Sequence, residues 1–197
     1  MMIYDALKKD HEKVSKLLDQ LVECSESGDD RWKDLVTEIR DELIPHSRAE
    51  EAVFYNGIRE ASEEGGKIVR GYAEHAVAET ELRALQAMKS VDVNFSALAR
   101  KLRDDLNHHV REEETEIFAA GKKVFSDAEA KQIGDAFRRL KPMIREQSLA
   151  GTTLDLIANL LPRRLADGFR TEFTKKVAQQ TAKIGKDEGK GTEQRSA

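Results

Sequence analysis

The stretch NHHVREEETEIF, residues 107–118, places two histidines and three glutamates in one predicted helix. An α-helix turns about 100° per residue, so His109 and Glu113 lie on the same face as the apolar residues of the segment. Glu112 and Glu114 lie on either side of that face and are expected to point into solvent. The stretch therefore predicts one histidine and one carboxylate that point into the core of a helical protein.

The same pattern recurs in three other predicted helices. Residues spaced alternately three and four apart form one inward-facing stripe per helix, as expected for a bundle. Each stripe contains a histidine, and in three of them a glutamate follows four residues later. His108 falls outside its stripe and is expected at the surface. The four stripes are Tyr4, Leu7, His11, Val14, Leu18 and Leu21; Trp32, Val36, Ile39, Leu43, His46, Glu50 and Val53; Ile68, Tyr72, His75, Glu79 and Leu82; and Phe95, Ala99, Leu102, Leu106, His109, Glu113 and Ile117.

Composition and chain breaks indicate an all-α fold. Charged residues make up 36% of the chain and only three prolines are present, a mixture typical of long helices. Four long helices joined by short turns predict an up-down-up-down four-helix bundle, followed by additional C-terminal helices. The predicted helices cover residues 3–27, 31–61, 67–89, 95–120 and 126–147.

Several residues are candidates for ending or bending these helices. Gly28 and Gly121 are expected to end the first and fourth helices, and Asn94 or Ser96 to cap the start of the fourth. Pro45 has no N–H group and is expected to kink the second helix or to divide it. An alternative role for this proline is to set the orientation of the histidine that follows it.

The chain divides into three predicted regions. Residues 1–125 form the bundle that carries the inward histidines and glutamates. Ser126 and Glu129 have the spacing of a capping box and begin additional helices over residues 126–178, which pack on the bundle or contact an unidentified protein partner. Residues 179–197 are polar and rich in lysine, glycine and glutamine, so we expect them to be disordered.

Charge and hydropathy exclude several classes of function. The net charge of −4 and the pI near 5.8 give no electrostatic basis for nucleic-acid binding. The sequence has no apolar segment long enough to cross a membrane, no signal-peptide pattern and a single cysteine, Cys24, so we expect a cytoplasmic protein. Neither a phosphate-binding loop, a dinucleotide-binding fingerprint nor a nucleophile elbow is present.

The inward polar residues predict a metal site. A buried carboxylate is costly unless it is paired or bound to a metal, and no lysine or arginine interrupts the stripes near these residues. One histidine–glutamate pair is by itself better explained as a surface contact, but three pairs and a fourth histidine in phase are not. Imidazole and carboxylate ligands suit iron, manganese or zinc, and this set is too large for one tetrahedral zinc. Two metals that share bridging carboxylates fit it.

At these residues the sequence resembles the hemerythrin-like family, also called the HHE cation-binding family, over about residues 1–125. The resemblance lies in the pattern H…HxxxE…HxxxE…HxxxE and in the local strings DHEKV, PHSRAEEAVFY and NHHVREEETEIF. It implies a four-helix bundle of hemerythrin type with a non-haem centre of two iron ions. The matching positions are His11, His46, Glu50, His75, Glu79, His109 and Glu113.

The resemblance also implies how the ligands divide between the metals. Glu50 and Glu113 would bridge the irons, with two histidines on each iron: His46 and His75 on one, and His11 and His109 on the other.

Two positions depart from the oxygen-carrying hemerythrins. Those proteins have a second histidine where this chain has Glu79, and an HxxxxD motif where it has His109 and Glu113. More carboxylate favours the ferric state, which disfavours a simple oxygen carrier. An alternative role for Glu79 is to orient a neighbouring histidine.

Tyr55 is a further candidate for the site. On an ideal helix it lies about 180° from His46, which favours a place elsewhere in the core or at the surface. An irregularity in the helix after Glu50 would turn Tyr55 inward, where it would approach the metals.

Three functions agree with these features to different degrees. The first is a di-iron protein that binds or consumes a small oxidant, such as oxygen, hydrogen peroxide or nitric oxide, with catalase-like removal of peroxide as its most specific form. The second is a module that binds iron or senses oxygen or iron, and passes a signal through the C-terminal helices. A purely structural bundle ranks last, because it leaves the inward histidines and glutamates unexplained.

Overall fold

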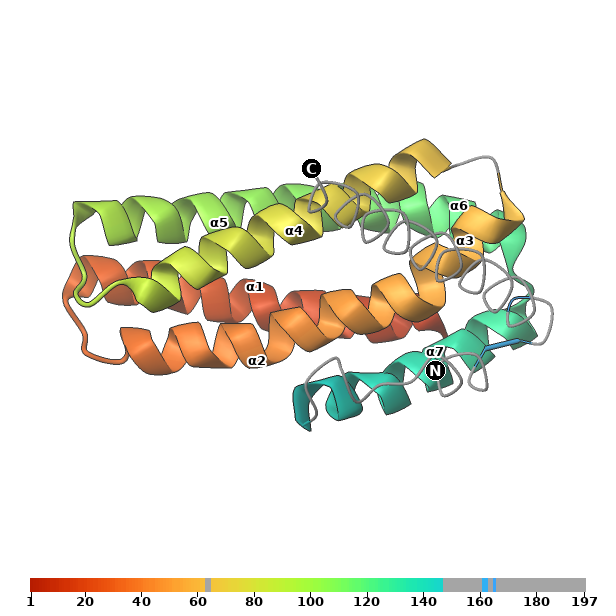
Figure 1. Cartoon of the computed structure of the whole chain (residues 1–197), viewed down its shortest axis with the longest axis horizontal. Coiled ribbons are helices and arrows are strands. Elements are labelled where there is room, and N and C mark those ends of the chain that lie inside the picture. The colour runs from red at the N-terminus through yellow and green to blue at the C-terminus, as the bar shows by residue number, and fades with distance from the viewer. Residues whose placement is uncertain (63–64, 147–160, 163–164, 166–197) are drawn as a thin grey trace, which may run out of the picture.

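The computed structural model describes residues 1–62, 65–146, 161–162 and 165, and every regular element in these residues is a helix. Four long helices form the predicted all-α bundle, and two of them contain a short π-helical segment (Figure 1). None of the described helices is long and apolar enough to cross a membrane. The elements are α1 (Ile3–Ser27); α2 (Trp32–Glu50), η1 (Glu51–Tyr55) and α3 (Asn56–Ala61) as one continuous helix; α4 (Gly65–Ala87); α5 (Val93–Glu112), η2 (Glu113–Ile117) and α6 (Phe118–Val124) as another; and α7 (Asp127–Glu146).

The ends of the helices follow local capping rules. Gly28 ends α1 as predicted, with the positive φ of 74° that favours glycine. The cap of α5 is Asp92, not Asn94 or Ser96, because the Asp92 carboxylate lies 2.9 Å from the free N–H groups of Asn94 and Phe95.

Two predicted interruptions lie inside continuous helices. Pro45 is buried within α2, which continues without a break to Glu50, so this proline does not divide the helix. Gly121 lies inside α6 and does not end it. A β-carbon at Gly121 would lie 2.9 Å from the ring of Phe54, so this glycine permits close packing between two helices.

The helices pack so that each of the four long helices has two neighbours. α1 lies beside α2 and α5, and α4 lies beside the same two helices on the opposite side of the bundle (Figure 1). The short turns between them produce the up-down-up-down order. α7 begins at the predicted capping box, in which Ser126 and Glu129 bind each other's backbone N–H groups, and it packs across α1 and α2.

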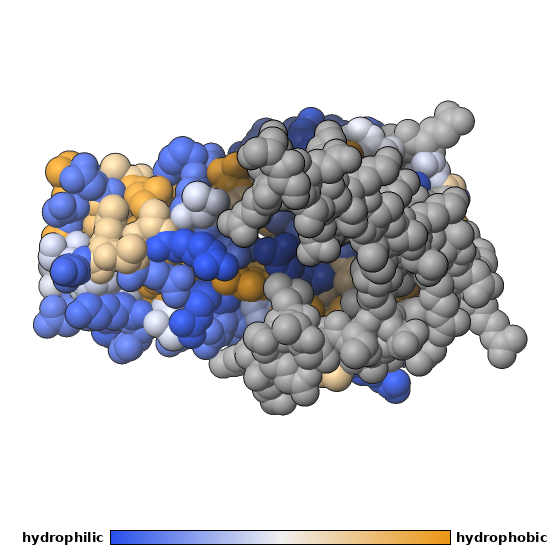
Figure 2. Space-filling view, viewed as in Figure 1, coloured by the Kyte–Doolittle hydropathy of each residue, from blue (hydrophilic) through white to orange (hydrophobic). Residues whose placement is uncertain are grey.

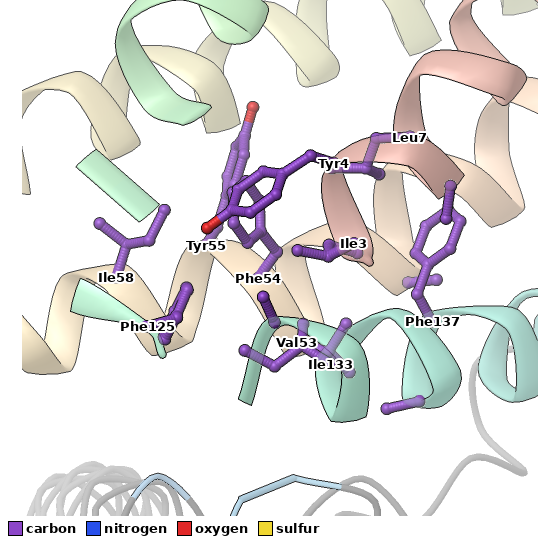
Figure 3. Close-up of a cluster of buried hydrophobic side chains, with 14 of the residues drawn as sticks. Ile3, Tyr4, Leu7, Val53, Phe54, Tyr55, Ile58, Phe125, Ile133 and Phe137 are labelled. Atoms are coloured by element: carbon purple, nitrogen blue, oxygen red, sulfur yellow. The ribbon is translucent and has the colours of Figure 1, made fainter. Parts of the chain in front are cut away.

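The apolar core is divided into two clusters along the bundle axis. One cluster, around Leu18, Ile39 and Phe95, fills the end at the α1–α2 and α4–α5 turns. The other, around Phe54 and Phe137, fills the opposite end and includes α7 (Figure 3). Outside, polar side chains cover most of the described surface seen in Figure 2, interrupted by small apolar areas. The inward histidines and glutamates occupy the layer between the two clusters.

The predicted regions beyond α7 fall mostly outside the described residues. Residues 147–160 and 166–197 are among those not described, so the second part of the 126–178 region and the disordered tail stay predictions. Leu161 and Leu165 are described, and both are buried in the cluster that contains Phe54.

Candidate metal centre

Each long helix of the bundle contributes at least one histidine to the polar layer between the apolar clusters. Glu50 lies at the end of α2, and Glu113 opens η2 after α5; both carboxylates are completely buried. The four histidines are also buried, with at most 6% of each residue exposed. The group consists of His11, His46, Glu50, His75, His109 and Glu113, which are six of the seven predicted core ligands.

The six side chains form two connected triads. The Nε2 atoms of His46 and His75 each lie 3.5 Å from Glu50 Oε2. The Nε2 atoms of His11 and His109 lie 3.2 and 3.6 Å from Glu113 Oε2. Each triad contains one of the two histidine pairs that the family resemblance implies, whereas the resemblance assigns both glutamates to both metals.

A direct contact joins the two triads across the bundle. His75 Nε2 and His109 Nε2 are 3.1 Å apart, and the ligand atoms of Glu50, His75 and His109 all lie within 4.8 Å of one another. The two triads therefore form a single polar centre.

The two π-helical segments begin where the buried carboxylates are. η1 starts directly after Glu50, and η2 starts at Glu113. A π-helical turn inserts an extra residue and rotates everything after it, and such segments occur frequently at functional sites. In this bundle, each π-helical segment allows a carboxylate to face the polar centre and places apolar residues of the next turn in the core.

Tyr55 is turned inward by η1, as the alternative interpretation of the sequence required. Its side chain is completely buried, and its ring stacks on His75 with centroids 5.5 Å apart and planes 5° apart. Gly71 leaves room for it, because a β-carbon there would lie 2.8 Å from the Tyr55 hydroxyl oxygen. That hydroxyl has no hydrogen-bond partner among the described residues, and burial together with the charges of Glu113 and Glu50 raises its pKa.

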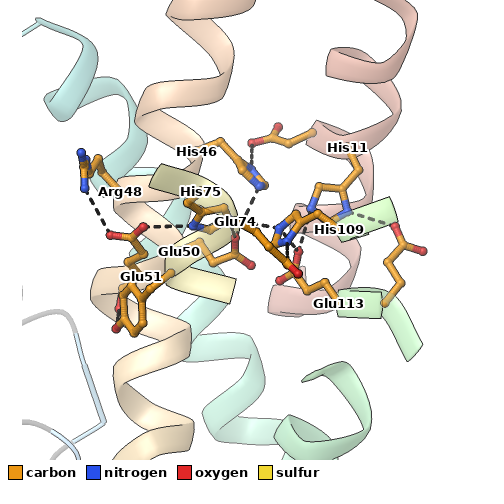
Figure 4. A network of polar contacts seen from close by, with 12 residues as sticks. His11, His46, Arg48, Glu50, Glu51, Glu74, His75, His109 and Glu113 are labelled. Carbon is orange, nitrogen blue, oxygen red and sulfur yellow. Dashed lines mark hydrogen bonds and ion pairs between the residues drawn. The ribbon is translucent and has the colours of Figure 1, made fainter. Parts of the chain in front are cut away.

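A second ring of carboxylates surrounds the histidines (Figure 4). Each Nδ1 atom faces a carboxylate from the neighbouring helix, so that the contacts run around the bundle from α1 to α2, α4, α5 and back to α1. The pairs are Asp10 with His46 at 3.3 Å, Glu51 with His75 at 3.0 Å, Glu74 with His109 at 2.7 Å and Glu114 with His11 at 3.0 Å. A carboxylate that accepts from Nδ1–H leaves Nε2 as the metal-binding nitrogen.

Each outer carboxylate also pairs with a cation further out. These cations supply the countercharge that the inward stripes lack. The pairs are Lys141 with Asp10 at 2.7 Å, Arg48 with Glu51 at 3.5 Å, Arg70 with Glu74 at 3.8 Å and Lys8 with Glu114 at 3.3 Å.

Glu79 departs from its predicted place. Its carboxylate pairs with Arg48 at 2.5 Å and with Arg83 at 2.6 Å rather than joining the six inward side chains. The alternative role, orienting a histidine, is taken for His75 by Glu51. The cause is geometric, because Arg48 lies between Glu51 and Glu79 and attracts both carboxylates.

The residues around His109 correct one detail of the sequence prediction. Glu114 was expected in solvent but accepts from His11, and Glu112 pairs with Arg70 at 2.9 Å. His108 is exposed, as predicted, and lies 3.4 Å from Glu112. The group of Glu74, His108 and Glu112, of which only His108 is exposed, also has ligand spacing, but Arg70 supplies its positive charge.

Burial and neighbouring charges shift the pKa values of His46, His11 and Glu50 in different directions. Burial lowers the pKa of His46 to about 4. Burial has the same tendency at His11, but the nearby carboxylates of Glu113 and Glu114 outweigh it and raise the pKa of this histidine to about 9. Burial and the nearby Glu113 charge raise the pKa of Glu50 well above its ordinary value.

The donor set fits a metal. Both oxygens of Glu50, both oxygens of Glu113 and His11 Nε2 are buried without a hydrogen-bond partner among the described residues. Buried polar atoms are normally paired, so five converging orphan atoms indicate a missing partner. A cation bound by nitrogen and oxygen donors would satisfy all of them. The fold and site thus define an all-α bundle with a candidate histidine–carboxylate metal centre.

Comparisons with known proteins agree with an all-α bundle that binds a cation. The family profile for the hemerythrin HHE cation binding domain matches residues 2–120, so the chain belongs to this family. A crystal structure of a hemerythrin HHE cation binding domain-containing protein from Mycobacterium kansasii superposes with a TM-score of 0.65, at 22% identity over 80% of this chain and 98% of that one.

Two curated relatives are similar in sequence. An uncharacterised hemerythrin-like protein of Schizosaccharomyces pombe is 28% identical over 149 residues, 74% of this chain and 72% of that protein. A DNA nickase of Nostoc is 28% identical over 147 residues, 75% of this chain. This chain spans only 41% of the length of the nickase.

Sequence reasoning missed the outer carboxylates, although a signal for them exists. Asp10, Glu51, Glu74 and Glu114 are each adjacent in the chain to an inward histidine or glutamate. An acidic residue beside an inward ligand points sideways, toward the next helix. Which histidine it reaches depends on how the helices are arranged.

Proposed function

We propose that this protein is a non-haem di-iron protein that binds or reacts with a small oxidant: oxygen, hydrogen peroxide or nitric oxide. The observation that carries the proposal is the pair of completely buried carboxylates, Glu50 and Glu113, each beside two histidine Nε2 atoms and without a geometrically formed hydrogen bond among the described residues. Two triads of this composition suit two metal ions that share carboxylate bridges.

In this proposal each residue has a defined task. Glu50, Glu113 and the Nε2 atoms of the four histidines would hold the two irons, with the carboxylates shared between them. Bound iron would supply one-electron redox chemistry, which the side chains alone lack. The outer carboxylates fix the histidine tautomers. Tyr55 is an additional candidate ligand, because its ring stacks on His75 and its buried hydroxyl has no hydrogen-bond partner among the described residues.

The space beside the histidines supports a small substrate. A cavity of about 20 Å³ is lined by all four histidines and by apolar side chains that include Val14, Leu18, Leu43 and Leu106. This volume accommodates about one water-sized molecule. It favours oxygen, peroxide or nitric oxide over larger organic substrates.

The first test is the iron content of protein produced with iron supplied. About two irons per chain are expected by mass spectrometry, and Glu50→Gln should lose them while the matched Glu79→Gln should not. Peroxide, oxygen and nitric oxide assays on the loaded protein then identify the oxidant. An iron content near zero in a folded protein would refute the proposal.

The second candidate is an iron-binding or oxygen-sensing module without turnover. The contact of Lys141 in α7 with Asp10 favours it, because it connects a helix outside the bundle to the centre. Rapid, repeated turnover of peroxide would exclude this candidate, whereas stoichiometric reaction would favour it. DNA nicking has no comparable support, since the net charge is −4 and the chain spans 41% of the nickase.

A further inference from the structure

α7 contacts the candidate metal centre through two residues that are one helical turn apart. The ring of Phe137 meets the ring of His46 edge to face, with centroids 5.7 Å apart and planes at 85°. Lys141 Nζ lies 2.7 Å from Asp10 Oδ2, the same oxygen that lies 3.3 Å from His46 Nδ1. His46 is therefore held by α7 directly through a ring contact and indirectly through Asp10.

A glycine on the same face of α7 allows this helix to pack closely against the start of α1. A β-carbon at Gly134 would lie 2.5 Å from the carbonyl oxygen of Met1 and 2.8 Å from the backbone nitrogen of Ile3. Gly134, Phe137 and Lys141 follow the spacing of one helical face. The backbone of α7 thus rests on the start of α1, and this contact places the two later residues at His46.

Lys141 differs from the other three cations that pair with the outer carboxylates. Its side chain is 18% exposed, whereas Lys8, Arg48 and Arg70 are 53%, 34% and 48% exposed. A less exposed ion pair is less screened by solvent and holds its geometry more strongly. Lys141 also lies 2.9 Å from Glu42, so one ammonium group joins carboxylates from α1 and α2.

We propose that Lys141 is a positioning residue of the metal centre, which acts through Asp10 to hold His46 in the orientation and tautomer required for metal binding. Without the ammonium group, the carboxylates of Asp10 and Glu42 would repel each other. Asp10 would then turn away, and His46 would lose the acceptor that keeps its proton on Nδ1. This inference rests on the proposed function, because it presupposes that His46 binds a metal.

The experiment measures the rate at which iron-loaded protein releases iron to an excess of chelator. Lys141→Met keeps most of the side-chain volume but removes the charge, and roughly tenfold faster release is expected, as for the loss of other partners that orient metal ligands. Lys141→Arg should restore the slow rate. Lys13→Met is the matched control, because Lys13 pairs with the same Glu42 at 2.7 Å, and it should release iron like the wild type.

A double-mutant cycle distinguishes action through Asp10 from simple support of α7. If Lys141 acts through Asp10, the double variant Asp10→Asn with Lys141→Met should release iron no faster than Asp10→Asn alone. Additive effects, or a Lys141→Met rate equal to that of the wild type, would overturn the inference. Lys141→Gln replaces the methionine variant if the latter does not fold.

The wild-type protein separates this inference from the proposed function. If the folded wild type binds no iron, both fail together. If it binds two irons and Lys141→Met behaves like the wild type, the inference alone fails.

Discussion

Replacement of Glu50 by glutamine should stabilise the metal-free protein while it abolishes iron binding. Burial and the adjacent Glu113 charge raise the pKa of Glu50 well above its ordinary value of 4.5, so a charged Glu50 destabilises the metal-free fold and protonation of this carboxyl would remove that charge. Protonating a carboxyl of that ordinary pKa at pH 7 costs about 3 kcal/mol, at about 1.4 kcal/mol per pH unit. Glutamine has nearly the same shape and does not incur this cost.

The expected gain is therefore at most about 3 kcal/mol, which corresponds to a rise of up to roughly 10 °C in melting temperature for a chain of this size. The pH dependence has a definite sign. Because the pKa of Glu50 is raised in the folded state, this carboxyl destabilises the fold at high pH and ceases to do so as the pH falls to its unfolded pKa. The stability gained by Glu50→Gln should therefore vanish as the pH falls to 4.5.

The assay is thermal unfolding of chelator-treated and iron-loaded samples at pH 7. Iron should raise the melting temperature of the wild type but not that of Glu50→Gln. Glu79→Gln is the control, since Glu79 pairs with Arg48 and Arg83, and it should keep the response to iron. A metal-free Glu50→Gln protein that melts several degrees below the wild type would refute the reasoning, because Glu50 would then have a stabilising partner.

Three further predictions address other parts of the centre and its support. Tyr55→Phe removes a buried hydroxyl that has no hydrogen-bond partner in the described part of the chain, and should raise the stability of the metal-free protein by about 1 kcal/mol in denaturant unfolding; a loss of stability would reveal a partner. Gly121→Ala places a β-carbon 2.9 Å from Phe54 and should cost about 1–3 kcal/mol in the same measurement, whereas no loss would show that the ring moves aside freely. His11 has a pKa raised to about 9, so its charged form should stabilise the metal-free protein by about 3 kcal/mol below pH 6.5. That contribution should disappear as the pH rises from 6.5 to 9, and a melting-temperature difference between wild type and His11→Gln that is constant over this range would contradict it.

The periodicity of the chain was sufficient to predict which residues of the bundle point inward. His11, His46, His75 and His109 each fall on a stripe of apolar residues, and a helix has only one phase that buries such a stripe. The resemblance to the HHE family at these positions is confirmed by the family comparison.

The periodic argument failed where the helices are not ideal. Tyr55 could be placed inside only by assuming an irregularity, which η1 provides. Glu79 lies on the inward stripe by phase, yet Arg48 and Arg83 hold its carboxylate outside the centre. Phase describes the direction of a side chain from its own helix, but not the partners that other helices bring to it.

The sequence by itself determined the four helices, the four inward histidines and the inward positions of Glu50 and Glu113, because these depend on spacing along one helix. Only the tertiary structure decided the ring of outer carboxylates, since each of them pairs with a histidine on a neighbouring helix. It also brought Lys141 to Asp10 over a separation of 131 residues. Contacts of this kind depend on the packing distance and rotation between helices, which the local pattern of a sequence does not contain.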